Sequence, residues 1–410
     1  LGPGQQSALS FLLKGKIPDL KPGLYEISVI YDYNQGEQTA ESSPVRLEVK
    51  PSTPHNLFLA SALGGASNSH YAAWINLDKG NAQVVWGHLE LIPGGGVRTV
   101  GIVEQASVRS EPVLSVPDNG QTAPGQWVAW VDSGQLCFHF FSPGTPALPP
   151  IKVPLNNNEA KIVGPIHWKP SDKTAPDLAS GEALVLLGSF PNVQFQSLLL
   201  NGSTAQSGGA ALVPGGRMPA WIQNTFLSGG GQLAPYALAE PGKIDLALLT
   251  WGHQNPMTSK PLCSWQGDFL AAACVMDETD KVHGGVLMWA GKADDTKELS
   301  LIPWTLAPDG RFSQGSPMKI KWESTATIAR AQISVNPKGQ FAAVVLKDDG
   351  AWDFISPAGK VSPLAGEFAK TDQALAVGFL TMIKPVLIGG TRSNGLKITG
   401  PDGSPIPPLK

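Results

Sequence analysis

Short apolar stretches separated by turn residues recur along most of the chain. From about residue 55 to the C-terminus, a short apolar strand is followed by a Gly, Asn or Asp turn, a second strand, another turn and a third strand. The first strand of each cycle is clearest at residues 57–61, 112–116, 161–168, 220–225, 327–335 and 375–381. The second strands are predicted at residues 71–76, 127–132, 182–187, 236–240, 269–276, 341–347 and 385–390.

One pair of segments repeats without a gap. Residues 71–88 and 236–253 match at six of eighteen positions at an offset of 165, and both end in Trp-Gly-His. An offset of 165 corresponds to three units of about 55 residues, which favours seven units over six or eight. A repeat of this length predicts a radial array of four-stranded sheets.

Composition agrees with an all-β chain. The 410 residues include 46 Gly and 36 Pro, which demand many turns, and 12 Trp as packing anchors. Charged residues make up only 15%, which is low for a helical bundle, and the 42% of apolar residues excludes a disordered chain. The tryptophans at 74, 86, 130, 168, 221, 251, 289, 322 and 352 are predicted to fill the spaces between neighbouring sheets.

The best single unit spans residues 327–364, with turns at 336–339 and 348–350 and the dipeptide Trp352-Asp353. Residues 127–144 repeat its second half. These motifs resemble the tryptophan–aspartate-repeat-like β-propellers of bacteria over most of residues 55–405. The resemblance implies a fold, a seven-bladed β-propeller over residues 53–410, and implies no activity. The outer strand of the last blade is expected from the N-terminal side, from residues 55–61 or the end of the preceding module.

The first 52 residues follow a different pattern. A strand with alternating side chains is predicted at 24–33, a polar loop follows, and a second strand is predicted at 45–49 before Pro51. This segment resembles the last hairpin of an immunoglobulin-like sandwich. Since such a domain needs about 100 residues, residues 1–52 are interpreted as a partial immunoglobulin-like module.

The repeated Trp-Gly-His supplies the candidate binding residues, namely Trp86, His88, Trp251 and His253. On a seven-bladed ring the two imidazoles lie nearly opposite each other, too far apart to share a metal, and no metal-ligand spacing occurs elsewhere. The alternative is structural, with the Trp packed between blades and the His at a strand end.

Other chemistry-bearing residues have structural interpretations as well. The acidic pairs at 277–278, 294–295 and 348–349 fit turns better than catalysis or calcium binding. His139 lies on an aromatic strand, two residues after Cys137, and is expected in the core. Cys263 and Cys274 are either bridged across adjacent strands or free.

The function predicted from these features is an extracytoplasmic, non-catalytic binding or scaffold module, periplasmic, secreted or at the cell surface. Its propeller loops would contact a protein or a glycan, without a cofactor. The alternatives are a propeller hydrolase or lyase acting on glycans, and a structural subunit of a larger cell-surface assembly. A net charge of −3 with scattered Lys and Arg argues against nucleic acid. No apolar run approaches eighteen residues, so no transmembrane segment is expected.

Overall fold

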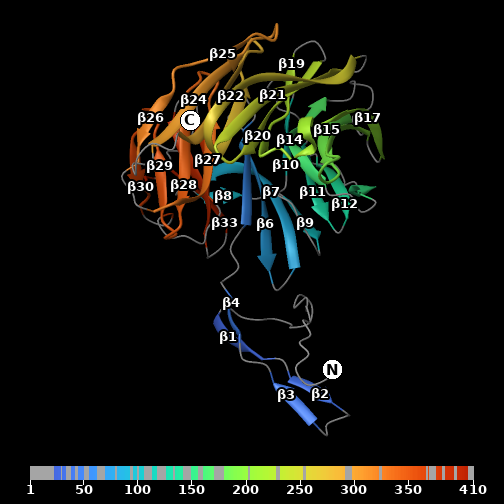
Figure 1. Cartoon of the computed structure of the whole chain (residues 1–410), viewed down its shortest axis with the longest axis vertical. Coiled ribbons are helices and arrows are strands. Elements are labelled where there is room, and N and C mark those ends of the chain that lie inside the picture. The colour runs from blue at the N-terminus through green and yellow to red at the C-terminus, as the bar shows by residue number, and fades with distance from the viewer. Residues whose placement is uncertain are drawn as a thin grey trace.

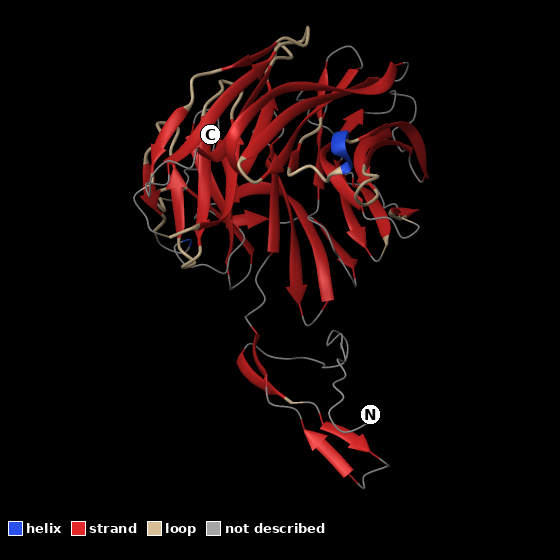
Figure 2. Cartoon of the chain, in the orientation of Figure 1, coloured by secondary structure: helices blue, strands red, loops and turns tan. Residues whose placement is uncertain are grey.

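The computed structural model describes residues 23–28, 30–33, 38–41, 45–49, 55–61, 70–78, 81–92, 96–98, 101–105, 113–117, 126–132, 134–141, 149–155, 160–169, 180–201, 204–227, 231–252, 255–290, 298–322, 326–365, 368, 375–380, 384–391 and 395–404. Strands dominate these residues, a short 3₁₀ turn occupies Pro214–Gly216, and no α-helix occurs among them (Figure 2). The all-β prediction is therefore confirmed.

The N-terminal strands pair as predicted, but the predicted strand 24–33 is divided in two and a further strand forms within the segment 34–43, which was predicted as a polar loop. Strand β1 (Gly23–Ile27) pairs with β4 (Val45–Val49), and β2 (Ile30–Tyr33) pairs with β3 (Gln38–Glu41), all antiparallel (Figure 1). The register shifts by one residue between the two pairs, beside the exposed Ser28. The assignment of residues 1–52 to an immunoglobulin-like module stays a prediction.

The rest of the chain forms successive antiparallel meanders (Figure 1). The first half contains β5 (His55–Ser61), β6 (His70–Asp78), β7 (Asn81–Ile92) and β9 (Gly101–Gln105); β10 (Val113–Pro117), β11 (Gln126–Asp132), β12 (Gln135–Phe141) and β13 (Ile151–Pro154); and β14 (Ala160–Lys169), β15 (Ser180–Leu187), β16 (Gln194–Asn201) and β17 (Thr204–Leu212). In each meander consecutive strands are hydrogen-bonded, as expected for strands joined by short turns.

The second half continues the pattern. It contains β18 (Trp221–Ile222), β19 (Thr225–Leu227), β20 (Gly231–Glu240), β21 (Lys243–Gly252) and β22 (Asn255–Met276); β23 (Val282–Ala290), β24 (Glu298–Leu306), β25 (Phe312–Gln314) and β26 (Met318–Lys321); β27 (Ile328–Val335), β28 (Phe341–Lys347), β29 (Trp352–Ile355) and β30 (Val361–Pro363); and β31 (Leu375–Leu380), β32 (Lys384–Thr391) and β33 (Gly395–Thr399). The final meander is extended by β8 (Gly96–Arg98).

One predicted strand has a different role. Residues 269–276 were expected as a second strand, but they form the end of β22, which is the first strand of its meander and pairs with β23. The first half of β22 is the last strand of the preceding meander, paired with β21. With β23 as the second strand, the second strands β6, β11, β15, β20, β23, β28 and β32 begin 43 to 59 residues apart. The short and long steps near residues 270–340 become steps of 51 and 59 residues.

The two ends of the array meet. Lys397 of β33 pairs with Gly96 of β8, which also pairs with the end of β7. The outer strand of the last meander thus comes from the N-terminal side, as expected, but from residues 96–98 and not from 55–61, because β5 is the first strand of its own sheet. First strands contact in a circuit that runs β5, β10, β14, β19, β22, β27, β31 and back to β5. None of the described sheets closes on itself through hydrogen bonds.

Apolar side chains fill the spaces between meanders. Alternate residues of β15 point to opposite faces, so Ala183 and Val185 pack against β11 and β12 while Leu184 and Leu186 pack against β20 and β21. Described tryptophans serve the same purpose. Trp322 packs edge-on to Trp289 at 6.3 Å between ring centroids, within the cluster that joins β24 to β28. Trp packing between sheets is confirmed for Trp251, Trp289, Trp322 and Trp352.

The 165-residue repeat is only partly structural. Both copies lie on the second and third strands of meanders three units apart, β6–β7 and β20–β21. However, the first hairpin turns after Asp78 and the second after Glu240, three positions out of step with the ungapped alignment. Tyr71 therefore pairs with His88, whereas Tyr236 pairs with Ala247. The equivalence of individual residues was wrong, although the separation in units holds.

Candidate functional site

Three large apolar side chains are exposed on two segments, 188–193 and 212–218, whose backbones contact each other. Phe190 is 70% exposed in the β15–β16 connection, Leu212 is 69% exposed at the end of β17, and Met218 is 37% exposed in the segment leading to β18. A large apolar side chain left in water contributes nothing to folding, so a group of them indicates an interaction site. We call these three residues the rim patch.

Backbone contacts hold the rim patch together. Val213 N donates to Val193 O at 2.9 Å, which continues the β16–β17 ladder past Leu212. Gly216 then approaches so closely that a Cβ there would lie 1.8 Å from the carbonyl oxygen of Pro191. Its φ of +65° also favours glycine. The segment carrying Leu212 and Met218 is therefore fixed against the loop carrying Phe190.

The next meander anchors the far side of the patch. Arg217 Nη1 donates to Glu240 Oε1 of the β20–β21 turn, and Ala220 N donates to Ala237 O at 2.9 Å. Since exposed ion pairs stabilise weakly, the backbone bond is the firmer anchor. The patch consequently bridges two meanders on a rigid base.

A buried polar cluster links the same two meanders from inside. Glu182 on β15 is 8% exposed, and its carboxylate accepts hydrogen bonds from Gln232 Nε2 and from Trp251 Nε1, the latter at 2.8 Å. Gln232 and Trp251 are themselves paired across β20 and β21. The cluster therefore joins the second strand of one meander to the second and third strands of the next.

The structure places the sequence-predicted residues as follows. Trp251 is buried and held by Glu182, so its role is structural. Trp86 and His88 lie on β7, where they pair with Ala73 and Tyr71. His253 lies outside the described residues. Of the four candidates, none is shown at the rim patch, and binding by Trp86, His88 or His253 stays a prediction.

The structure decides between the two alternatives for Cys263 and Cys274, which are not bridged. Cys137, Cys263 and Cys274 are free. Cys263 and Cys274 lie on one strand, β22, paired with Leu246 and Gly284 respectively. Eleven residues of extended chain span on the order of 30 Å, against the roughly 4–7 Å that a bridge requires between Cα atoms. Burial raises the pKa of the Cys137 thiol to about 11 and that of Cys263 to about 12, which makes both poor nucleophiles.

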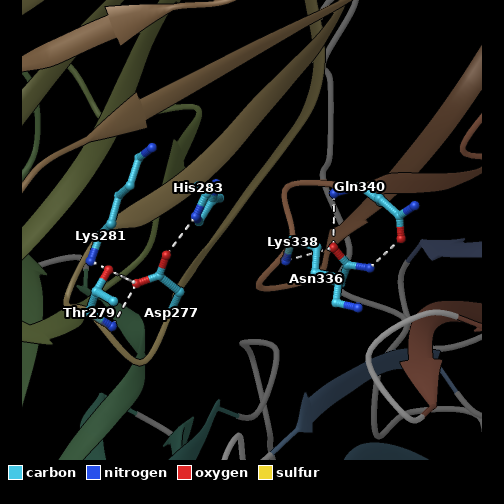
Figure 3. A network of polar contacts seen from close by, with 7 residues as sticks. All are labelled: Asp277, Thr279, Lys281, His283, Asn336, Lys338 and Gln340. Carbon is cyan, nitrogen blue, oxygen red and sulfur yellow. Dashed lines mark hydrogen bonds and ion pairs between the residues drawn. The ribbon is translucent and has the colours of Figure 1, made fainter.

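The acidic pairs that the structure describes serve turns, as predicted. Asp277 Oδ1 accepts from the backbone N–H of Thr279 and Lys281, at 2.8 and 3.1 Å. Figure 3 shows the same arrangement beside it, where Asn336 Oδ1 accepts from Lys338 and Gln340. Asp349 Oδ1 accepts a hydrogen bond from the backbone N–H of Ala351 in the β28–β29 turn. The pair at 294–295 lies outside the described residues.

Acid is expected to weaken the fold partly through Asp277. Burial raises the pKa of this carboxyl, but hydrogen bonds from Thr279, His283 and Lys281 outweigh it and hold the pKa at about 2. A carboxyl whose pKa is lowered in the folded protein stabilises the fold at pH values above its ordinary pKa, which is near 4. This contribution of up to about 2 kcal/mol is lost as the pH falls toward 2.

Urea unfolding of the wild type and Asp277→Asn between pH 6 and pH 2.5 measures this effect. Asparagine fits the turn, as Asn336 shows at the matching position. The gap between the two proteins should be widest at pH 6 and should narrow steadily toward pH 2.5, because the folded-state pKa is about 2. A gap that is constant with pH would contradict the role assigned to the charge.

Other chemistry is sparse in the described part of the chain. There, no three His, Cys, Asp or Glu residues converge as a metal site would require. Within the same residues, no helix has the length and apolarity to cross a membrane. His139, as expected, is buried on β12, and burial lowers its pKa.

The strand order and the circuit of first strands define an all-β protein of propeller-like architecture. No protein-family model and no curated protein matches the sequence. Among solved structures, BBS1N in complex with ARL6DN aligns at 14% identity over 85% of this chain and 97% of that chain, with a TM-score of 0.41. KlAtg21 in complex with the coiled-coil of AgAtg16 aligns at 9% identity over 85% of this chain and 94% of that chain, with a TM-score of 0.48. A subtype N10 neuraminidase-like protein of the little yellow-shouldered bat isolate from Guatemala aligns at 11% identity over 77% and 96%, with a TM-score of 0.40.

Sequence reasoning missed the rim patch. A signal for it exists, because residues 183–216 contain no Asp, Glu, Lys, Arg or His. Such a long uncharged run includes the exposed strand β17 and two of the three patch residues. Surface strands and loops without charge are unusual, and the run marks this rim as different from ordinary solvated surface.

Proposed function

We propose that residues 53–410 form a seven-bladed β-propeller that acts as a non-catalytic, protein-binding module. The seven blades are the seven meanders, each with a second strand at near-regular spacing and a first strand in the contact circuit. β8 serves as the outer strand of the last blade. A ring of this kind presents rigid loops and rims, which suits recognition of a partner.

The observation that carries the binding function is the rim patch. Phe190, Leu212 and Met218 are exposed on a base fixed by Gly216 and by the link to Glu240. Apolar anchors on a pre-organised base are the usual source of affinity in protein–protein interfaces.

Affinity capture from the native source with quantitative mass spectrometry tests this function. The bait pair is the wild type and the Phe190→Asp, Leu212→Asp double variant. A charge placed in a buried apolar interface should lower recovery of the partner at least about tenfold. The matched control is the Ala358→Asp, Ser316→Asp double variant, since both positions are exposed and lie on other meanders.

Two outcomes decide the matter. Loss of the same proteins from the rim variant and their retention by the control supports the patch as the binding surface. Equal recovery by all three baits contradicts it. An extracytoplasmic location stays a prediction from the sequence, and fractionation of the native source with an antibody to this chain tests it.

A further inference from the structure

Strand β17 is an open sheet edge. It ends the order β13-β12-β11-β10-β14-β15-β16-β17, and seven of its nine residues are exposed. Figure 1 shows it at the rim of the body. Nine residues extend over about 30 Å. An edge of this length displays a row of backbone N–H and C=O groups that can pair with another strand.

The edge of β17 lacks the protections that edge strands normally carry. Proteins guard edges by making them short, by adding charges or by adding Pro. Among the described outer edges, β25 and β30 have three residues each, and β30 contains Pro363. Charged residues mark the others, namely Glu104 on β9, Lys152 on β13, Lys260 on the outer half of β22, and Lys319 and Lys321 on β26. β17 (TAQSGGAAL) has nine residues with neither charge nor Pro.

We propose that two copies of this chain pair through β17, antiparallel and about a two-fold axis. A two-fold contact places the same surface on both sides of the interface. An edge with charges of one sign would therefore place like charges opposite each other, and these would repel. Of the described outer edges longer than three residues, β17 alone meets a copy of itself without that cost. It is also an ordered, exposed and neutral strand already, so pairing with a copy costs little ordering entropy.

The direction of the backbone groups identifies the residues that would pair. Val213 N donates to Val193 O, so this residue faces β16. Because successive residues of an antiparallel strand face alternate sides, the N–H groups of Ala210 and Leu212 point away from β16. Both residues are exposed. These two N–H groups are therefore donors available to the second copy. The residue before Ala210 is Gly209, which has no side chain to clash with a proline placed at position 210.

Sedimentation of purified protein from 1 to 100 µM tests the proposal. The wild type should sediment as a dimer at the upper end of this range. Ala210→Pro removes one outward donor from each copy while sparing the β16 ladder, and should weaken the dimer Kd by roughly tenfold or more. Ala210→Ser keeps the donor and should dimerise like the wild type. A wild type that is monomeric at 100 µM, or an unchanged Kd for Ala210→Pro, overturns the proposal.

A cysteine series protects the test against misfolding of the proline variant. Gln206→Cys, Ser207→Cys and Ala210→Cys are made singly, with Ala358→Cys as the exposed control on β29–β30. Mild oxidation should link copies at one β17 position and not at the control. Equal linking at all positions overturns the proposal. The inference does not depend on the rim patch function, since Phe190 lies outside β17 and a Phe190→Asp single variant can lose a foreign partner and still be tested for dimer formation.

Discussion

Replacing Glu182 with alanine is expected to lower the free energy of unfolding by about 2–4 kcal/mol. The change removes the acceptor for Gln232 Nε2 and Trp251 Nε1. Both donors are on buried side chains, 4% and 5% exposed, so water does not readily replace the lost partner. The cost is the desolvation of two unpaired donors, together with a cavity between two meanders.

Two controls separate this cause from a general effect of removing a carboxylate. The exposed side chain of Glu298 forms an ion pair with Lys319 at 3.3 Å. Glu298→Ala should therefore lower the free energy of unfolding by less than about 0.5 kcal/mol. Glu182→Gln keeps one acceptor oxygen and should fall between the wild type and the alanine variant. Urea unfolding followed by Trp fluorescence gives all three values. If Glu182→Ala costs no more than Glu298→Ala, the cluster does not hold the two meanders together.

Adding one methyl group at Gly284 is expected to cost about 3 kcal/mol. A Cβ on this residue of β23 would lie 2.0 Å from the ring of Trp304, which is 1% exposed on the paired strand β24. Trp304 belongs to the cluster that joins β20–β22 to β23–β24, so the ring has no free space to enter. The variant must displace a buried indole.

Gly209→Ala is the matched control, because its Cβ would make ordinary contact with Met257 at 3.7 Å. This substitution should change stability by less than about 1 kcal/mol. Differential scanning calorimetry of the two variants compares them directly. A Gly284→Ala protein with the melting temperature of Gly209→Ala would show that the packing of Trp304 is looser than described.

Much of the strand pattern follows from the sequence. The alternation in residues 327–364 predicts β27, β28 and β29, because Pro-x-Gly and Asp-Asp-Gly fix the turns between them. The same turn chemistry is weak around residue 267. There β22 runs 22 residues through two sheets, and Gly267 at φ +150° marks the junction. Periodicity of two continues across such a junction, so the sequence alone does not show that the strand changes partners.

The pairing of the two ends of the array and the candidate site were harder to predict. Pairing of β8 with β33 joins residues that are 301 positions apart in the sequence. A strand of three residues is too short to carry a pattern that identifies its partner. Trp-Gly-His attracted attention because it repeats, yet Trp251 is needed to satisfy the buried Glu182. Phe190 and Met218 come from two loops, and these loops meet where Gly216 packs on Pro191. Only the uncharged run 183–216, which contains Phe190 but not Met218, pointed toward the rim patch.

The central claim is that the meanders form one closed propeller, with N-terminal β8 completing the last blade. A Gly96→Cys, Lys397→Cys double variant tests it most directly, because paired antiparallel residues have Cα atoms about 4.5–5.5 Å apart, within reach of a disulfide. The native Cys137 and Cys274 are buried. After mild oxidation of the folded protein, mass spectrometry should find an intrachain cross-link between positions 96 and 397, absent from each single variant. Failure of this cross-link to form in a folded double variant would contradict closure.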